Sequence, residues 1–331
     1  NKATVAIVGA GSIGSAWAIV FASAGHDVRL FDTEAERLAA ARATIAARLA
    51  DLAAFELIDD APAAILSRVT SESSLTTALR DVTHVQECAP ENLDLKRALF
   101  ADLDRLGPPH ATIASSSSFM PASQYAAELL CRDRVLVAHP GNPPYLIRVV
   151  EIVPAPFTSA ETVTTVTRLM QAAGMTPVTL AREIDGFVFN RLQGALLAEA
   201  YALVEDGIIG VDGVDALVRD GLGLRWSLLG PFETVDLNTQ GGIAKHAERM
   251  GPYYFRMRQA RGKPVAGEGW SAGIGGRKGK KHRWMAGASL RYGAAGFARQ
   301  RDVLYVVSST PRHGPQACTW HEPTARRVPR L

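Results

Sequence analysis

The sequence predicts an α/β fold in which a Rossmann-type doubly wound sheet is followed by an all-α C-terminal domain. Two patterns in the 331 residues predict it. Through roughly the first half, short β-branched apolar runs alternate with longer Ala-rich amphipathic stretches, which is typical of βαβ units. After residue 182, apolar residues recur at helical spacing over residues 187–206, and no convincing strand follows up to residue 258.

The elements of the first half follow from this alternation, because each apolar run is short enough for a strand and each intervening stretch is long enough for a helix. Such an order favours a parallel sheet with helices on its faces. We expect strands at residues 4–8, 28–31, 82–87, 112–114, 135–138, 149–153 and 177–180. We expect helices at residues 15–24, 33–50, 93–106, 160–173 and 187–206.

The composition excludes several classes of protein. With 47% hydrophobic and 21% charged residues, the chain is neither disordered nor collagen-like. Its three cysteines, Cys88, Cys131 and Cys318, show neither disulfide-framework nor metal-ligand spacing, so we expect no metal site. Neither a run of 18 apolar residues nor a signal-peptide pattern is present, so we expect a cytoplasmic protein that does not bind a membrane.

A glycine-rich turn follows the first expected strand. It stands between a strand and a helix, which is the context that a dinucleotide-binding turn requires. Gly9 would permit the tight turn, Gly11 would let the backbone approach a pyrophosphate, and Gly14 would let the helix pack closely on the strand. A glycine-rich turn without a ligand is the alternative. The motif reads Gly9-Ala10-Gly11-Ser12-Ile13-Gly14.

Asp32 strengthens the dinucleotide interpretation. It ends the second expected strand, 18 residues after Gly14, close to the spacing of an acidic residue that binds a ribose. A carboxylate there accepts hydrogen bonds from the ribose hydroxyls and repels a 2'-phosphate, so NAD is favoured over NADP. Asp32 would also serve as a simple N-cap of the next helix.

Polar residues gather where later strands end. Four serines, residues 115–118, follow the fourth expected strand, His139 ends the fifth, and Glu151 lies on the sixth. Open α/β sheets bind ligands at the carboxyl ends of their strands. His139 and Glu151 therefore form a plausible dyad, in which the carboxylate orients the imidazole and stabilises its charged form. A lone histidine without this context is more often structural.

At this point the sequence resembles the 3-hydroxyacyl-CoA dehydrogenase family, and most closely its branch with lambda-crystallin and L-gulonate 3-dehydrogenase. The resemblance covers roughly residues 4–260 and rests on several ordered motifs. They are Gly9-x-Gly11-x-x-Gly14, Pro90-Glu91-Asn92-Leu93-x-Leu95-Lys96, the serine run, His139-x-x-Asn142-Pro143 with Glu151, and Asp185-Gly186-Phe187-Val188-x-Asn190-Arg191-Leu192.

The resemblance implies a role for each matching position. His139 matches the general base, Glu151 its orienting carboxylate, Ser117 the serine that binds the substrate hydroxyl, and Asn190 a substrate-binding amide. Ser118 takes the serine's role if the register differs by one residue. The positions that border the nicotinamide half of the cofactor site are Glu91, Lys96 and Asn142. Taken singly, Lys96 and Asn190 would more often be structural residues.

The substrate expected from the resemblance is a small 3-hydroxy acid. Acyl-CoA enzymes of the family carry lysines after the second strand, whereas residues 33–68 hold no Lys and residues 51–60 are acidic. Arg225 would pair with a substrate carboxylate, or else bridge helices as a structural residue. We expect NAD-dependent oxidation of a 3-hydroxyl, as in an L-gulonate 3-dehydrogenase. The alternatives are 3-hydroxybutyryl-CoA and carnitine as substrates.

Three regions are expected: an NAD-binding domain at residues 1–182, a helical substrate and dimerisation domain at 183–260, and a tail at 261–331. The tail has fourteen Lys and Arg against three acidic residues, although the whole chain carries only +3. We expect a poorly ordered, non-family segment, for which a change of reading frame is one hypothesis. The non-enzyme alternatives are a crystallin-like structural protein and nucleic-acid binding through the tail, which lacks a stacking platform.

Overall fold

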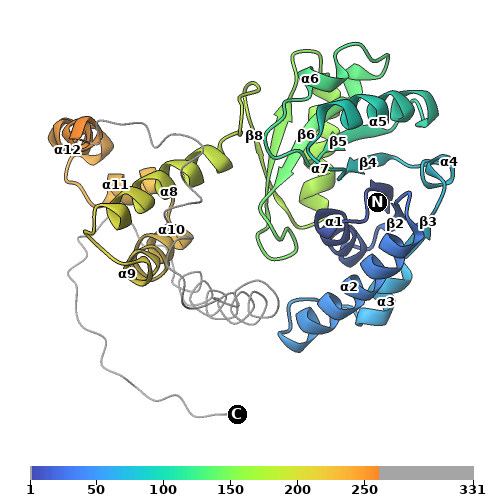
Figure 1. The fold of residues 1–331 in the computed structure, drawn as a ribbon, viewed down its shortest axis with the longest axis horizontal. Coiled ribbons are helices and arrows are strands. Elements are labelled where there is room, and N and C mark those ends of the chain that lie inside the picture. Colours follow the sequence, from blue (N-terminus) through green and yellow to red (C-terminus); the bar gives the residue numbers. More distant parts are fainter. Residues whose placement is uncertain (1, 261–331) are drawn as a thin grey trace.

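The computed structural model describes residues 2–260, which form a sheet-containing region followed by a helical region (Figure 1). The strands are β1 Thr4–Val8, β2 Asp27–Phe31, β3 Val69–Glu72, β4 His84–Glu87, β5 Thr112–Ser115, β6 Val135–Pro140, β7 Val149–Pro154 and β8 Thr176–Thr179. The helices of the sheet region are α1 Ser12–Ser23, α2 Ala35–Ala54, α3 Pro62–Ser67, α4 Leu75–Ala78, α5 Leu93–Leu106, α6 Ser123–Ala126 and α7 Ala160–Ala172. The helical region contains α8 Phe189–Glu205, α9 Val211–Ala216, α10 Leu224–Leu228, α11 Pro231–Leu237 and α12 Gly242–Ala260. A 3-10 turn, Arg132–Arg134, precedes β6, and a π-helical segment, Leu217–Gly223, joins α9 to α10.

The strands form one sheet in the order β3-β2-β1-β4-β5-β6-β7-β8, and β1 to β6 are parallel. The predicted doubly wound fold is therefore confirmed, with the strand order reversing between β1 and β4. Ligands bind at such a reversal, outside the carboxyl ends of the strands.

Two details of the sheet differ from the expectation. β7 runs antiparallel to β6, because residues 141–148 are too few for the crossover that parallel strands need. β3 was not expected as a strand, because its sequence, Val69-Thr70-Ser71-Glu72, contains one buried residue and no apolar run. β3 lies at the edge of the sheet, where a strand needs little apolar surface.

Helices cover both faces of the sheet and complete two apolar layers. One layer contains α1, α2, α3 and α7, with Trp17 and Phe21 of α1 fully buried. The other contains α4, α5 and α6, where the rings of Phe100 and Tyr125 lie 4.7 Å apart. Each large apolar side chain buried in this way contributes about 1.5 to 3 kcal/mol. The two layers hold the strand ends, and hence the polar residues there, in fixed positions.

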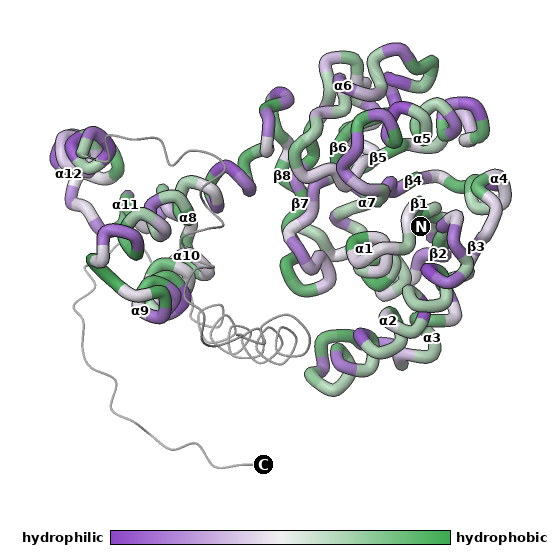
Figure 2. The backbone as a smooth tube through the Cα atoms, viewed as in Figure 1, coloured by the Kyte–Doolittle hydropathy of each residue, from purple (hydrophilic) through white to green (hydrophobic). Residues whose placement is uncertain are grey.

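The helical region buries far less of its apolar surface. Along α8 to α12, hydrophobic and hydrophilic stretches alternate in Figure 2, as expected of amphipathic helices. Among the residues that the structure describes, Leu192 is 66% exposed, Phe232 is 75% exposed and Leu237 is 70% exposed. No helix within residues 2–260 has the length and apolar character needed to cross a lipid bilayer.

Candidate active site

The glycine turn has the geometry that its sequence predicts. Gly9 has a φ of +111°, and a Cβ there would lie 2.8 Å from the Cys88 carbonyl oxygen. A Cβ on Gly14 would lie 1.8 Å from the Gly9 oxygen, so the helix packs against the turn. A Cβ on Gly11 would meet no atom within 4 Å, and no side chain caps α1, whose first amides remain open to a ligand. An anion fits this cradle.

Asp32 lies beside the cradle. One carboxylate oxygen accepts a hydrogen bond of 2.9 Å from the Ala10 amide, and the other accepts one of 3.1 Å from the Glu34 amide. The side chain is nearly buried at the end of β2, so its charge is held close to the turn. Glu34 follows, and no basic side chain stands between Asp32 and Glu34. The local negative charge therefore favours a ribose without a 2'-phosphate.

His139 and Glu151 form the expected dyad. They are register partners on β6 and β7, and 2.8 Å separates His139 Nδ1 from Glu151 Oε2. Both side chains are buried. Because a carboxylate only accepts hydrogen bonds, Nδ1 carries the proton, and the lone pair of the neutral ring is on Nε2. Within residues 2–260, Nε2 has no hydrogen-bond partner.

The second oxygen of Glu151 holds the start of α8. Oε1 accepts hydrogen bonds of 2.8 Å from the Val188 amide and 2.9 Å from the Phe189 amide. Burial by itself would raise the pKa of Glu151, but the hydrogen bonds from His139, Phe189 and Val188 outweigh it and lower the pKa. The carboxylate therefore stays charged opposite the imidazole.

A left-handed turn directs these amides toward Glu151. Gly186 has a φ of +71° and Phe187 a φ of +50°, a conformation that is costly for a residue with a Cβ. The buried Phe187 ring lies 5.5 Å from the His139 ring, and the Phe189 ring lies 6.3 Å from it. The turn thus supplies both the amides that bind Glu151 and the apolar wall around His139.

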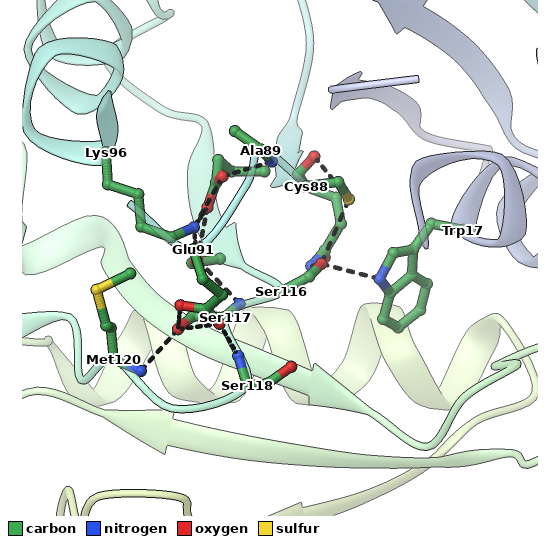
Figure 3. Close-up of polar contacts among 12 residues, drawn as sticks. Trp17, Cys88, Ala89, Glu91, Lys96, Ser116, Ser117, Ser118 and Met120 are labelled. Carbon is green, nitrogen blue, oxygen red and sulfur yellow. Dashed lines mark hydrogen bonds and ion pairs between the residues drawn. The ribbon is translucent and has the colours of Figure 1, made fainter. Parts of the chain in front are cut away.

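The serine run begins at the end of β5, which lies between β1 and β6 in the sheet, and continues as a loop. The hydroxyls of its labelled serines point in different directions (Figure 3). Ser117 Oγ donates to the Glu91 carboxylate at 3.0 Å and accepts from the Met120 amide at 2.9 Å. Ser117 is 2% exposed. Ser118 is half-buried, its amide donates to Glu91, and its hydroxyl has no hydrogen bond to any residue that the structure describes.

Asn190 joins this loop from the first turn of α8. Its Nδ2 donates a 2.9 Å hydrogen bond to the Ser118 carbonyl oxygen. Since Glu151 holds the amides just before Asn190, the dyad, the serine loop and the start of α8 are brought together.

The remaining predicted residues make no hydrogen bond to the dyad within residues 2–260. Lys96 is buried in an ion pair with Glu87, with 2.8 Å between Nζ and Oε2. Asn142 is exposed in the loop after β6. Arg225 is exposed on α10, in the helical region away from the dyad (Figure 1). Among the residues described, no group of His, Cys, Asp and Glu side chains is arranged to hold a metal ion.

Several residues in and under the serine loop were given no individual role by the sequence. Ser116 Oγ accepts hydrogen bonds from Trp17 Nε1 at 3.0 Å and from Gln86 Nε2 at 2.8 Å. Gln86 in turn contacts the buried His84. Glu87 and Ser115 also lie under the loop. Hydrogen-bonding partners could have been expected for Gln86 and Glu87, because polar residues inside an apolar strand are seldom left unpaired.

A dinucleotide-binding sheet that also carries a buried His–carboxylate pair, on β6 and β7, has the features of a dinucleotide-dependent dehydrogenase. The family comparisons specify it further. Residues 4–184 match the NAD binding domain of 3-hydroxyacyl-CoA dehydrogenase, and residues 186–282 match the C-terminal domain of the same enzyme. The chain belongs to the 3-hydroxyacyl-CoA dehydrogenase family, and it is an NAD-dependent oxidoreductase.

Individual relatives agree with this assignment. The chain is 43% identical over 249 residues to a lambda-crystallin homolog of Bos taurus, which covers 75% of this chain and 77% of the relative. It is 41% identical over 249 residues to an L-carnitine dehydrogenase of Streptomyces griseus, covering 75% of this chain and 73% of the relative. The crystal structure of 3-hydroxybutyryl-CoA dehydrogenase from Escherichia coli K12 superimposes with a TM-score of 0.62 at 32% identity, covering 72% of this chain and 49% of that one.

The comparisons also bear on the C-terminal part of the chain. The match to the C-terminal family domain runs to residue 282, past residue 260, where the resemblance was expected to end. The expected basic tail, and with it the nucleic-acid alternative, lies outside the described residues.

Proposed function

We propose that the chain oxidises the 3-hydroxyl of a small 3-hydroxy acid, with His139 as the general base. The observation that carries this proposal is the 2.8 Å contact between His139 Nδ1 and Glu151 Oε2 in a buried pair. This contact fixes the tautomer and leaves Nε2 free to take the hydroxyl proton. Glu151 then stabilises the imidazolium that forms.

The cofactor and the oxygen-binding groups complete the mechanism. NAD, when bound, accepts the hydride from the substrate carbon. The glycine turn and Asp32 are the groups that would hold its pyrophosphate and ribose. Ser118, whose hydroxyl has no other partner among residues 2–260, is the serine best placed to hold the substrate oxygen. Ser117 already donates its proton to Glu91 and accepts from Met120, so we give it a structural role.

The charges after β2 favour a free acid over an acyl-CoA. The segment from residue 33 to 68 contains four arginines, and each has a partner within the protein. Asp60 lies 2.6 Å from Arg68, and Asp51 lies 3.4 Å from Arg48. The other two contact Glu34 and the Val69 carbonyl oxygen. Among the described residues, this segment offers no unpaired cation for a nucleotide phosphate.

Three substrates test the proposal. L-gulonate is our leading candidate, and L-carnitine and 3-hydroxybutyryl-CoA are the alternatives. NADH formation from NAD is followed with each, in purified full-length protein. Oxidation of either free acid supports the proposal. Oxidation of the acyl-CoA alone contradicts the substrate assignment, while binding of NADH without oxidation of any of the three contradicts the proposed function.

We also propose a homodimer formed through the helical region. Within the described part of the chain, the apolar side chains of α8 and α11, among them Leu192, Phe232 and Leu237, are not covered. Apolar area of this kind is typical of an obligate interface. Sedimentation equilibrium of the full-length protein is expected to give twice the chain mass, and a monomer at micromolar concentration would contradict the dimer.

A further inference from the structure

A closed network of charged and hydroxyl groups lies under the serine loop (Figure 3). Lys96 Nζ lies 3.0 Å from Glu87 Oε1, 2.8 Å from Glu87 Oε2 and 3.3 Å from Ser115 Oγ. Ser115 Oγ donates to Glu87 Oε2 at 2.5 Å. The three residues come from α5, from the end of β4 and from the end of β5, and each is at most 1% exposed.

The network uses the hydrogen-bonding capacity of its members. A lysine ammonium has three protons, and those of Lys96 are directed at the two Glu87 oxygens and at Ser115. The Ser115 hydroxyl donates once and accepts from Lys96 and from the Ser117 amide. In this arrangement the Lys96 ammonium is held against Glu87 and Ser115.

Two main-chain amides connect the network to the site. The Ser117 amide donates to Ser115 Oγ at 3.2 Å, and the Ala89 amide donates to Glu87 Oε1 at 2.7 Å. Ala89 leads into Glu91, whose carboxylate accepts from the Ser117 hydroxyl and the Ser118 amide. The network thus fixes the two chain segments that together set the position of Ser118.

A buried ion pair is an expensive way to gain stability, because the cost of desolvating both charges is of the order of their attraction. What a saturated pair supplies is a defined geometry for the groups bonded to it. We propose that Glu87, Lys96 and Ser115 are positioning residues that hold the serine loop in the conformation needed for hydride transfer. This inference rests on the function proposed above.

The sharpest test is Ser115→Ala, which removes the link to the Ser117 amide and leaves the Glu87–Lys96 pair. We expect kcat to fall about 10- to 100-fold, as misplacement of a reacting group by about 1 Å does. The Kd for NADH is expected to change less than about threefold. Ser116→Ala removes the neighbouring hydroxyl, which does not bond the Ser117 amide. A kcat of Ser115→Ala equal to that of the wild type, or no lower than that of Ser116→Ala, would overturn the proposal.

Charge variants separate positioning from direct cofactor binding. Glu87→Gln and Lys96→Met each leave one buried charge without its partner, so both are expected to lower Tm, and the double variant is expected to recover part of the loss. Positioning predicts that the double variant, despite its recovered Tm, keeps a reduced kcat and binds NADH nearly as the wild type does. A Kd for NADH raised about tenfold in Lys96→Met, but not in Ser115→Ala, would instead make Lys96 a cofactor ligand.

Amide hydrogen exchange tests the network without any substrate. Peptides covering residues 115–120 are expected to exchange faster in Ser115→Ala than in the wild type or in Ser116→Ala. Unchanged exchange would refute the network's role whatever the reaction is. If the wild type binds NADH yet oxidises no 3-hydroxy acid, the proposed function fails, and the exchange experiment alone decides whether the network holds the loop.

Discussion

Glu151 faces His139 across the paired strands β6 and β7 and bonds it through one carboxylate oxygen, while its other oxygen binds the amides of Val188 and Phe189. One side chain therefore orients the imidazole and fixes the start of α8, the helix that carries Asn190. The position of the helical region and the direction of the histidine ring depend on the same carboxylate.

Replacing Glu151 with Gln is expected to damage both activity and stability. An amide retains one acceptor oxygen, so either His139 or the two main-chain amides lose their bonding partner. We expect kcat to fall about 10²-fold or more, because general base catalysis is worth about 10² to 10⁴. The free energy of unfolding should fall by about 1 to 3 kcal/mol. Glu161→Gln on the exposed side of α7 is the control, and an unchanged kcat in Glu151→Gln would contradict the dyad.

The two serines are separated by single substitutions. Ser118→Ala is expected to lower kcat/KM by about 10- to 100-fold with little change in Tm, because it removes a bond to the substrate oxygen alone. Ser117→Ala is expected to lower stability by about 1 to 2 kcal/mol, since the Met120 amide loses its partner. Steady-state kinetics and thermal unfolding measure the two effects. Loss of activity in Ser117→Ala with full activity in Ser118→Ala would reverse the assignment.

Asp32 is expected to set the preference for NAD. Asp32→Asn removes the charge that we propose binds the ribose and that holds the Ala10 amide, so the Kd for NADH should rise about 10- to 100-fold. The ratio of the Kd values for NADPH and NADH should fall toward one. Asp27→Asn is a matched control, because Asp27 begins the same strand and pairs with Lys2. The Kd values are measured by titration of protein fluorescence. An equal change of the Kd for NADH in the two variants would argue against a contact between Asp32 and the ribose.

His84 makes the fold sensitive to mild acid. It is fully buried between Thr112 and Gln86, and burial lowers its pKa from 6.5 to about 4. The unfolded chain takes up this proton below pH 6.5, whereas the folded chain resists it until about pH 4, so stability falls as the pH falls through this window. The contribution reaches about 3 kcal/mol.

His84→Gln keeps two hydrogen-bonding groups but has no proton to gain. Urea unfolding between pH 7 and 4.5 should therefore show a loss of stability about 2 to 3 kcal/mol smaller in the variant than in the wild type. Parallel pH profiles of the two proteins would show that His84 is not held neutral by the fold.

Local sequence was sufficient where the functional residues stand at recognisable strand ends. The glycine turn, Asp32 and the His139–Glu151 pair were all predicted, because each lies at a strand end or on neighbouring strands. β3 was not predicted, because Thr70 and Ser71 make no apolar run and the strand is held by pairing with β2. The direction of β7 follows from the length of the preceding loop rather than from its own residues.

Side-chain direction was the part that sequence left open. Ser117 and Ser118 are adjacent and chemically identical, and only the loop's bonds to Glu91 and Met120 distinguish them. The motif around Lys96 indicated a residue near the cofactor, but lysine is seldom fully buried, and its partner Glu87 lies on another element. Contacts between distant elements of this kind have no local signal.

The central claim, that His139 is the base, is tested most directly by His139→Gln. Initial rates of NADH formation are measured with NAD and the best 3-hydroxy acid substrate, beside the Kd for NADH of the same preparation. The account predicts a kcat lower by about 10² or more, with a Kd changed less than about threefold. A variant that binds NADH and turns over at the wild-type rate would contradict it.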